Sequence, residues 1–203
     1  AMAAMKDEWD RLRKMGTWDD TTVRPWRAVA REALAKSEEV HFGYLFRIKV
    51  ENGSEFPKGD PKRYYKYRVV FQGNAVKDQD WNVALFQEMA STPATLDASR
   101  IADAYGCFAG NAIDTRDVEQ AYLQAELKGP PTWIVLPKEL WTDEMHNMRC
   151  PVVKLERALY GHKHSGNFWE EYCRKQCEKA GFEHVGEEWP GVFWDEKAQL
   201  LLI

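Results

Sequence analysis

Residues 44–50 have the sequence Tyr-Leu-Phe-Arg-Ile-Lys-Val, and here the hydrophobic pattern of the chain takes on the two-residue period of a β-strand. Residues 64–71, Tyr-Tyr-Lys-Tyr-Arg-Val-Val-Phe, alternate in the same way and place Lys66 and Arg68 together on one face. Glycines and prolines between the two stretches indicate a loop. The sequence therefore predicts a long-looped hairpin with a cationic face, for which cross-strand salt bridges are the ordinary explanation.

On both sides of this hairpin, apolar residues recur at spacings of three and four, as in amphipathic helices. We expect helices over residues 2–15, about 25–36, 95–108 and, from a cap at Ser165, 165–180. Short strands are expected at residues 113–118, 133–136, 152–155, 192–194 and 200–203, the last two forming a hairpin. Helices and strands alternate irregularly, which predicts an α+β fold of antiparallel strands and packed helices.

The composition is that of a folded protein, with 44% hydrophobic and 13% aromatic residues among 203. A net charge of −4 argues against a simple nucleic-acid-binding module. The charge is uneven, however, because residues 1–73 carry 15 Lys and Arg against 11 Asp and Glu, and the remainder carries 13 against 21. This distribution suits a protein that holds a polyanion in one place and metal ions in another, and equally an ordinary solvated surface.

No apolar run approaches the ~20 residues of a membrane helix, and we expect no membrane partner. The four cysteines have no paired CxxC spacing, so reduced thiols in an intracellular protein are expected. Cys173 and Cys177, with His162 and His164 upstream, allow a zinc site; two small residues on the core face of a helix are the favoured interpretation.

The stretch Asp117-Val-Glu-Gln-Ala-Tyr122 carries the first candidate chemistry. A carboxylate at the end of a strand, followed by a small residue and an aromatic one, could ligate Mg²⁺, which prefers hard oxygen ligands. Two such ions can activate a 3′-hydroxyl and stabilise leaving pyrophosphate. Taken alone, the pattern more often means a helix cap at Asp117 and a core aromatic at Tyr122.

Four short blocks follow one another along nearly the whole chain: Gly16-Thr17-Trp18; Phe42–Lys49 with Tyr65–Val70 and Gly73; Asp117-Val118 with Ala121-Tyr122-Leu123 and Leu127; and Lys154-Leu155, Leu159-Tyr160-Gly161, Lys163, Trp169 and Gly181-Phe182. In this order and spacing they resemble the reverse-transcriptase domain of copia-type long-terminal-repeat retrotransposons. The resemblance implies fingers and a partial palm: helices and fingers hairpin in 1–90, palm in 91–127, a fingers return in 128–164, and palm helix with truncated catalytic hairpin in 165–203.

The resemblance also assigns roles to residues. It makes Asp117 the first catalytic carboxylate and gives the Val118 carbonyl to one of two Mg²⁺ ions. Lys66 and Arg68 grip the incoming triphosphate, and Tyr122 lies under the sugar and excludes a 2′-hydroxyl. The turn from Tyr160 to Ser165 borders nucleotide and template, with His164 at the nucleotide and Lys163 at the template or primer.

Two departures from the family bear on its activity. His162 and His164 stand where the family has Leu and Gln, and its Tyr-x-Asp-Asp turn would come directly after residues 200–203. We therefore expect a fragment that is inactive alone and belongs to a polyprotein with thumb, ribonuclease H and integrase. Its expected partners are primed RNA or DNA template and dNTPs, in a cytoplasmic retrotransposon particle or the nucleus. The alternative is a catalytically inactive nucleic-acid-binding remnant or domesticated domain.

Overall fold

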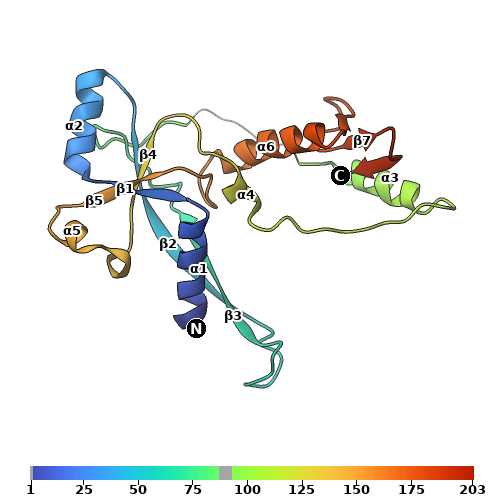
Figure 1. Cartoon of the computed structure of the whole chain (residues 1–203), viewed down its shortest axis with the longest axis horizontal. Coiled ribbons are helices and arrows are strands. Elements are labelled where there is room, and N and C mark those ends of the chain that lie inside the picture. The colour runs from blue at the N-terminus through green and yellow to red at the C-terminus, as the bar shows by residue number, and fades with distance from the viewer. Residues whose placement is uncertain (1, 87–92) are drawn as a thin grey trace.

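The computed structural model describes residues 2–86 and 93–203. The larger lobe holds the following elements: α1 (Met2–Lys14), β1 (Trp18–Pro25), α2 (Trp26–Lys36), β2 (His41–Asn52), β3 (Tyr64–Phe71), β4 (Thr132–Val135), a 3-10 turn (Lys138–Leu140), α5 (Asp143–His146) and β5 (Pro151–Leu155). The second lobe holds α3 (Leu96–Gly106), α6 (Ser165–Lys179), β6 (Glu183–His184), β7 (Phe193–Asp195) and β8 (Leu200–Leu202). The short helix α4 (Ala121–Gln124) lies where the two lobes meet (Figure 1).

The two lobes are built from alternating parts of the chain (Figure 1). Residues 2–86 and 128–164 supply the larger lobe, and residues 93–120 and 165–203 supply the other. The chain therefore leaves the first sheet, enters the second lobe and returns to the first sheet as β4 and β5. None of the helices among the described residues is both long and apolar enough to cross a bilayer.

The larger sheet has the strand order β1-β5-β4-β2-β3 and is mixed rather than antiparallel. Its β2 and β4 run parallel, with Phe42 opposite Trp133, whereas its other pairs are antiparallel. The expected α+β class is confirmed, and the expectation of antiparallel strands alone is wrong for this pair. A parallel neighbour needs a long crossover, and the excursion through the second lobe supplies one.

Helices α1 and α2 cover the two faces of this sheet. Successive side chains of a strand point to opposite faces, so each helix packs against a different set of strand residues. The α1 side buries, among others, Trp9, Leu12, Val69, Phe71, Ile134, Val153 and Leu155. The α2 side buries Trp26, Val29, Ala30, Ala33, Val40, Phe42, Trp133 and Val152. Each large side chain buried in this way contributes about 1.5–3 kcal/mol to folding.

The predicted helices and most predicted strands are confirmed within one or two residues. Residues 113–118 are the exception, because they form no strand and are exposed to solvent. No strand in the described part of the chain is paired with this segment, so its backbone has no ladder to join. Ser165 also differs from its predicted role, because it is the first helical residue and its buried Oγ donates to the Leu159 carbonyl at 2.7 Å.

Two glycines fix the end of β3 against the turn that precedes α6. A Cβ on Gly73 would lie 2.1 Å from the Gly161 carbonyl oxygen, and a Cβ on Gly161 would lie 2.1 Å from the Phe71 carbonyl oxygen. Gly161 also has a φ of +89°, a conformation that side-chain-bearing residues rarely adopt. The Phe71 N–H donates to the Tyr160 carbonyl at 2.7 Å across the same contact. This close approach brings Tyr160 next to the hairpin.

Candidate functional site

The cationic face of the hairpin is confirmed by the β2–β3 register. Lys66 lies opposite Val50 and Arg68 lies opposite Ile48, so aliphatic residues rather than carboxylates face the two cations across the ladder. Both cations are exposed, and neither forms an ion pair with any residue of 2–86 or 93–203. Cross-strand salt bridges therefore do not explain this face in the described structure.

Basic residues elsewhere on the same hairpin have partners. Arg47, on the opposite face of β2, forms an ion pair with Glu139 at 2.5 Å. Lys49 on that face lies over the Tyr65 ring, 4.2 Å from its centroid. Lys66 and Arg68, by contrast, form no ion pair with the described residues, and the Arg68 guanidinium contacts the Tyr160 ring, so the charges of both are available to an external anion.

The apolar half of this face is exposed as well. Four side chains of β2 are each about 39–45% exposed: Tyr44, Phe46, Ile48 and Val50. They continue the row that begins with Phe42, which is fully buried under α2. The hairpin extends beyond α2, so its outer surface combines two aromatic rings, two aliphatic side chains and two cations. Exposed aromatic rings beside cations are found where proteins bind nucleic-acid strands.

Arg68 is linked through one aromatic ring to Tyr122. Its guanidinium carbon lies 5.8 Å from the centroid of the Tyr160 ring. The Tyr160 and Tyr122 rings then contact each other, with centroids 4.8 Å apart. Two residues expected at the triphosphate and the sugar, 54 positions apart in the sequence, are thus separated in space by a single tyrosine.

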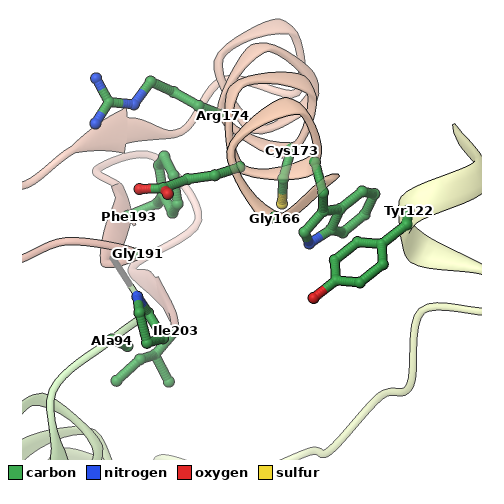
Figure 2. A pocket seen from close by; sticks show the side chains of 11 residues that line it. Ala94, Tyr122, Gly166, Cys173, Arg174, Gly191, Phe193 and Ile203 are labelled. Carbon is green, nitrogen blue, oxygen red and sulfur yellow. The ribbon is translucent and has the colours of Figure 1, made fainter. Parts of the chain in front are cut away.

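Tyr122 also lines a pocket of about 290 Å³ between α4, α6 and the smaller sheet. Figure 2 shows Tyr122 on one side of this pocket, Phe193 and Ile203 on the other, and Cys173 of α6 between them. The walls are mostly apolar, so a tyrosine hydroxyl is one of few polar groups at its rim. Ile203, which directly follows β8, and the aromatic residue expected at the sugar therefore share one pocket.

Asp117 and Val118 lie in the exposed segment that precedes α4. Val118 is 48% exposed, and the described residues contain no group of three His, Cys, Asp or Glu side chains that could hold a metal ion. One carboxylate and one main-chain carbonyl fit only part of a magnesium site, since Mg²⁺ takes six oxygens. The two residues could contribute ligands and could not form the site alone.

The structure gives no support to the alternative of a zinc site at Cys173 and Cys177. Cys177 is buried, and burial together with the neighbouring Cys173 raises the pKa of its thiol to about 11. Zinc binds the thiolate form, which this environment disfavours. Cys177 is a core residue of α6, as the favoured interpretation predicted, whereas Cys173 is half-buried and lines the Tyr122 pocket.

His164 and Tyr122 line different pockets. Gly166, Trp169, Glu170 and Cys173 of α6 line the Tyr122 pocket. His164 and Phe168 line a second one of about 440 Å³. At 100° per residue these two sets lie on opposite sides of the helix. The structure thus brings Arg68 and Tyr122 together and does not place His164 with Tyr122.

Lys163 lies beside the second pocket rather than in it. Its Nζ is 4.9 Å from the centroid of the Phe86 ring, and no residue in the described ranges forms an ion pair with it. Phe86 could not have been selected from the sequence, because it stands outside every recognisable motif. Tyr160, by contrast, belongs to a block that the sequence already marked, although its contact with Tyr122 could not be read from it.

His162 is the most strongly perturbed base near either pocket. Burial, with repulsion from His164 and His41, lowers its pKa to about 3. The unfolded chain has an ordinary histidine pKa of ~6.5, so between pH 6.5 and 3 the unfolded state binds more protons than the native state. Stability is therefore unaffected above pH 6.5 and falls as the pH is lowered towards 3.

We expect the free energy of unfolding to decrease by about 2 kcal/mol more in the wild type than in His162→Phe between pH 7 and pH 5. Urea denaturation of both proteins at the two pH values measures this difference. Titration of all other groups is common to both proteins and cancels in the comparison. An equal decrease in the two proteins would mean that His162 takes up its proton in the native state as readily as in the unfolded state.

Comparison with known proteins assigns no family: no protein-family model matches the chain, and no solved structure is significantly similar to it.

Proposed function

We propose that this chain is the fingers and part of the palm of an RNA-directed DNA polymerase of the copia-type retrotransposon class, which transfers dNTPs onto a primer. The observation that carries the proposal is the line Arg68–Tyr160–Tyr122. A cation for the triphosphate and an aromatic ring for the sugar lie where one nucleotide could touch both. The sequence motifs alone give the order of these residues along the chain and do not give the distances between them in space.

The alternating lobes give further support. Fingers and palm in this proposal comprise 1–90 with 128–164 and 91–127 with 165–203; the described residues of the first pair lie together in the larger lobe, and residues 93–120 and 165–203 of the second pair lie in the other, with α4 where the lobes meet. Four consecutive domains along a chain would not predict such interleaving. The exposed apolar side chains of α3, Leu96 and Ile101, offer a surface to the remainder of a polyprotein.

In the proposed enzyme, Lys66 and Arg68 bind the triphosphate, and their charge would also attract primed RNA or DNA template. Lys163, which lies next to Phe86 and forms no ion pair with the residues that the structure describes, is proposed at the template or primer, and His164 at the border of the nucleotide site. Asp117 and the Val118 carbonyl would supply two oxygens for Mg²⁺, whose chemistry when bound is to activate the 3′-hydroxyl and stabilise pyrophosphate. The proposed setting is a cytoplasmic retrotransposon particle or the nucleus.

A nucleic-acid-binding remnant without catalysis is the second candidate. The specific observation in its favour is that the described residues contain no group of three His, Cys, Asp or Glu side chains that could hold a metal ion at Asp117. Both candidates use the hairpin face, and only the enzyme needs Tyr122 at a sugar. Primer extension by a form of the protein that carries the Tyr-x-Asp-Asp turn distinguishes them.

We expect the double variant Lys66→Ala/Arg68→Ala to bind a primer–template about 10- to 100-fold more weakly at 50 mM salt. Each lost phosphate contact removes about one unit from the slope of log affinity against log salt, so the slope should fall by about two. Fluorescence anisotropy of a labelled primer–template between 50 and 200 mM salt measures both quantities.

The matched control is Arg47→Ala/Lys49→Ala, which removes the same charge from the partnered face of the same hairpin. We expect this control to stay within about threefold of the wild type. Equal losses in the two double variants would show that net charge, and not the Lys66–Arg68 face, governs binding.

A further inference from the structure

The second pocket is a separate cavity on the opposite side of α6 from Tyr122. It encloses about 440 Å³ and lies among the start of β2, residues 85–86, the loop 128–130 and the residues leading into α6. Cavities of about 300–1,000 Å³ commonly take small molecules. Of the residues proposed above at the nucleotide, Lys66, Arg68 and Tyr122 do not line it, and only His164 does.

One polar side chain in its lining is almost completely buried and lacks a partner at one nitrogen. His162 is 7% exposed, and its Nδ1 accepts a hydrogen bond from the His164 N–H at 3.3 Å. A neutral imidazole that accepts at Nδ1 carries its hydrogen at Nε2. No group in residues 2–86 or 93–203 accepts that hydrogen. This nitrogen is not among the fully buried, unpartnered side-chain atoms of the described residues, so it is open to the cavity, where a ligand can accept its hydrogen.

A second histidine offers the complementary group. His41, 3% exposed, lies on the same cavity, and its Nε2 donates to the Glu39 carboxylate at 2.9 Å. In the neutral ring, Nδ1 is then an acceptor, and nothing in the described part of the chain donates to it. The cavity therefore provides one N–H donor and one nitrogen acceptor.

Flat rings make up much of the remaining wall. Phe86 is central, because the centroid of its ring lies 4.8 Å from that of His41, 5.5 Å from that of His162 and 5.2 Å from that of His164. Phe168 closes the α6 side, 6.4 Å from His162. Aromatic side chains bind other rings favourably in stacked and edge-on arrangements.

We propose that this cavity binds a planar heterocycle that carries both a carbonyl acceptor and a ring N–H, the chemistry of a pyrimidine-type nucleobase. The carbonyl accepts from His162 Nε2–H, the ring N–H donates to His41 Nδ1, and Phe86 with Phe168 contacts the faces or edges of the ring. The two charged side chains of the lining already have partners: Lys128 forms an ion pair with Glu171 at 2.5 Å, and the Glu39 carboxylate accepts from His41 at 2.9 Å. A neutral, flat ligand fits this lining better than an anion.

Uridine is a suitable probe, and saturation-transfer NMR with the whole chain detects its binding. We expect saturable binding at millimolar uridine and affinity five- to tenfold lower in His162→Phe, the loss of about one hydrogen bond. His162→Gln keeps an N–H donor and should stay within about threefold of the wild type. His146→Phe, an exposed histidine on α5, is the control and should bind as the wild type does.

Two further measurements separate this proposal from its alternatives. Histidine-ring ¹H–¹⁵N spectra of the wild type should show a neutral ring protonated at Nε2 whose signal shifts when uridine is added, which tests the donor even if a variant fails to fold. Lys66→Ala/Arg68→Ala should bind uridine unchanged, so failure of the polymerase proposal leaves this result intact. The proposal is overturned if uridine does not bind, if His162→Phe binds it as well as the wild type, or if no histidine ring responds.

Discussion

Replacing Tyr122 by valine is expected to raise the ratio of ribonucleotide to deoxynucleotide incorporation by one to three powers of ten. The measurement requires a form of the protein that carries the Tyr-x-Asp-Asp turn after Ile203. In the proposed enzyme the Tyr122 ring fills the space that a ribose 2′-oxygen would occupy. Removing a clash worth roughly 1.4–4 kcal/mol in the transition state changes the ratio by this factor.

The structure makes Tyr122 suitable for this test. Its ring is half-buried, lines the pocket that ends at Ile203 and contacts Tyr160 rather than the main core. The substitution should therefore leave the fold intact, although deoxynucleotide incorporation falls because the sugar loses its support. A ratio of two efficiencies measured on one preparation is also insensitive to the fraction of folded protein.

Tyr172→Val is the matched control, because Tyr172 packs against the same small cluster as Tyr122 and lies outside the Tyr122 pocket. Its ratio should equal that of the wild type. A folded, active Tyr122→Val protein with an unchanged ratio would make Tyr122 a packing residue only. The placement of Asp117 at the metal would then lose its support, because both residues come from the same sequence block.

Gly161→Ala is expected to lower the free energy of unfolding by about 2–5 kcal/mol. The left-handed backbone conformation of Gly161 alone costs an L-residue about 1–2 kcal/mol, and a methyl group 2.1 Å from the Phe71 carbonyl oxygen forces the two segments apart. The hydrogen bond from Phe71 N–H to the Tyr160 carbonyl lies in the same contact. Urea denaturation monitored by tryptophan fluorescence measures the loss.

Gly129→Ala separates backbone strain from the close approach. Gly129 has a similar φ of +85°, but a Cβ there meets no atom within 4 Å. The free energy of unfolding of the Gly129→Ala protein should fall by about 1–2 kcal/mol, the cost of the backbone conformation alone. Gly73→Ala should resemble Gly161→Ala, because its Cβ meets the Gly161 carbonyl oxygen from the other side. Equal losses in the Gly129 and Gly161 variants would mean that the two segments can separate without cost.

The sequence by itself determined the local structure. Helix α1 ends at Lys14 and Gly16 follows with φ +64°, and α6 ends before Gly181 with φ +99°, as their glycines predict. The alternation in residues 64–71 placed Lys66 and Arg68 on one exposed face. These features depend on near neighbours in the chain, so a periodic pattern is sufficient to predict them.

Only the tertiary structure decided which elements meet. The parallel pairing of β2 with β4, the Arg68–Tyr160–Tyr122 line and the two pockets on opposite sides of α6 all join residues far apart in the sequence. Residues 113–118 show the opposite case, because a segment that the sequence predicts as a strand stays unpaired where no strand of the described residues lies beside it. Periodicity specifies which face of an element is apolar, whereas the partner of that face is set by long-range packing and hydrogen bonding, which no local pattern encodes.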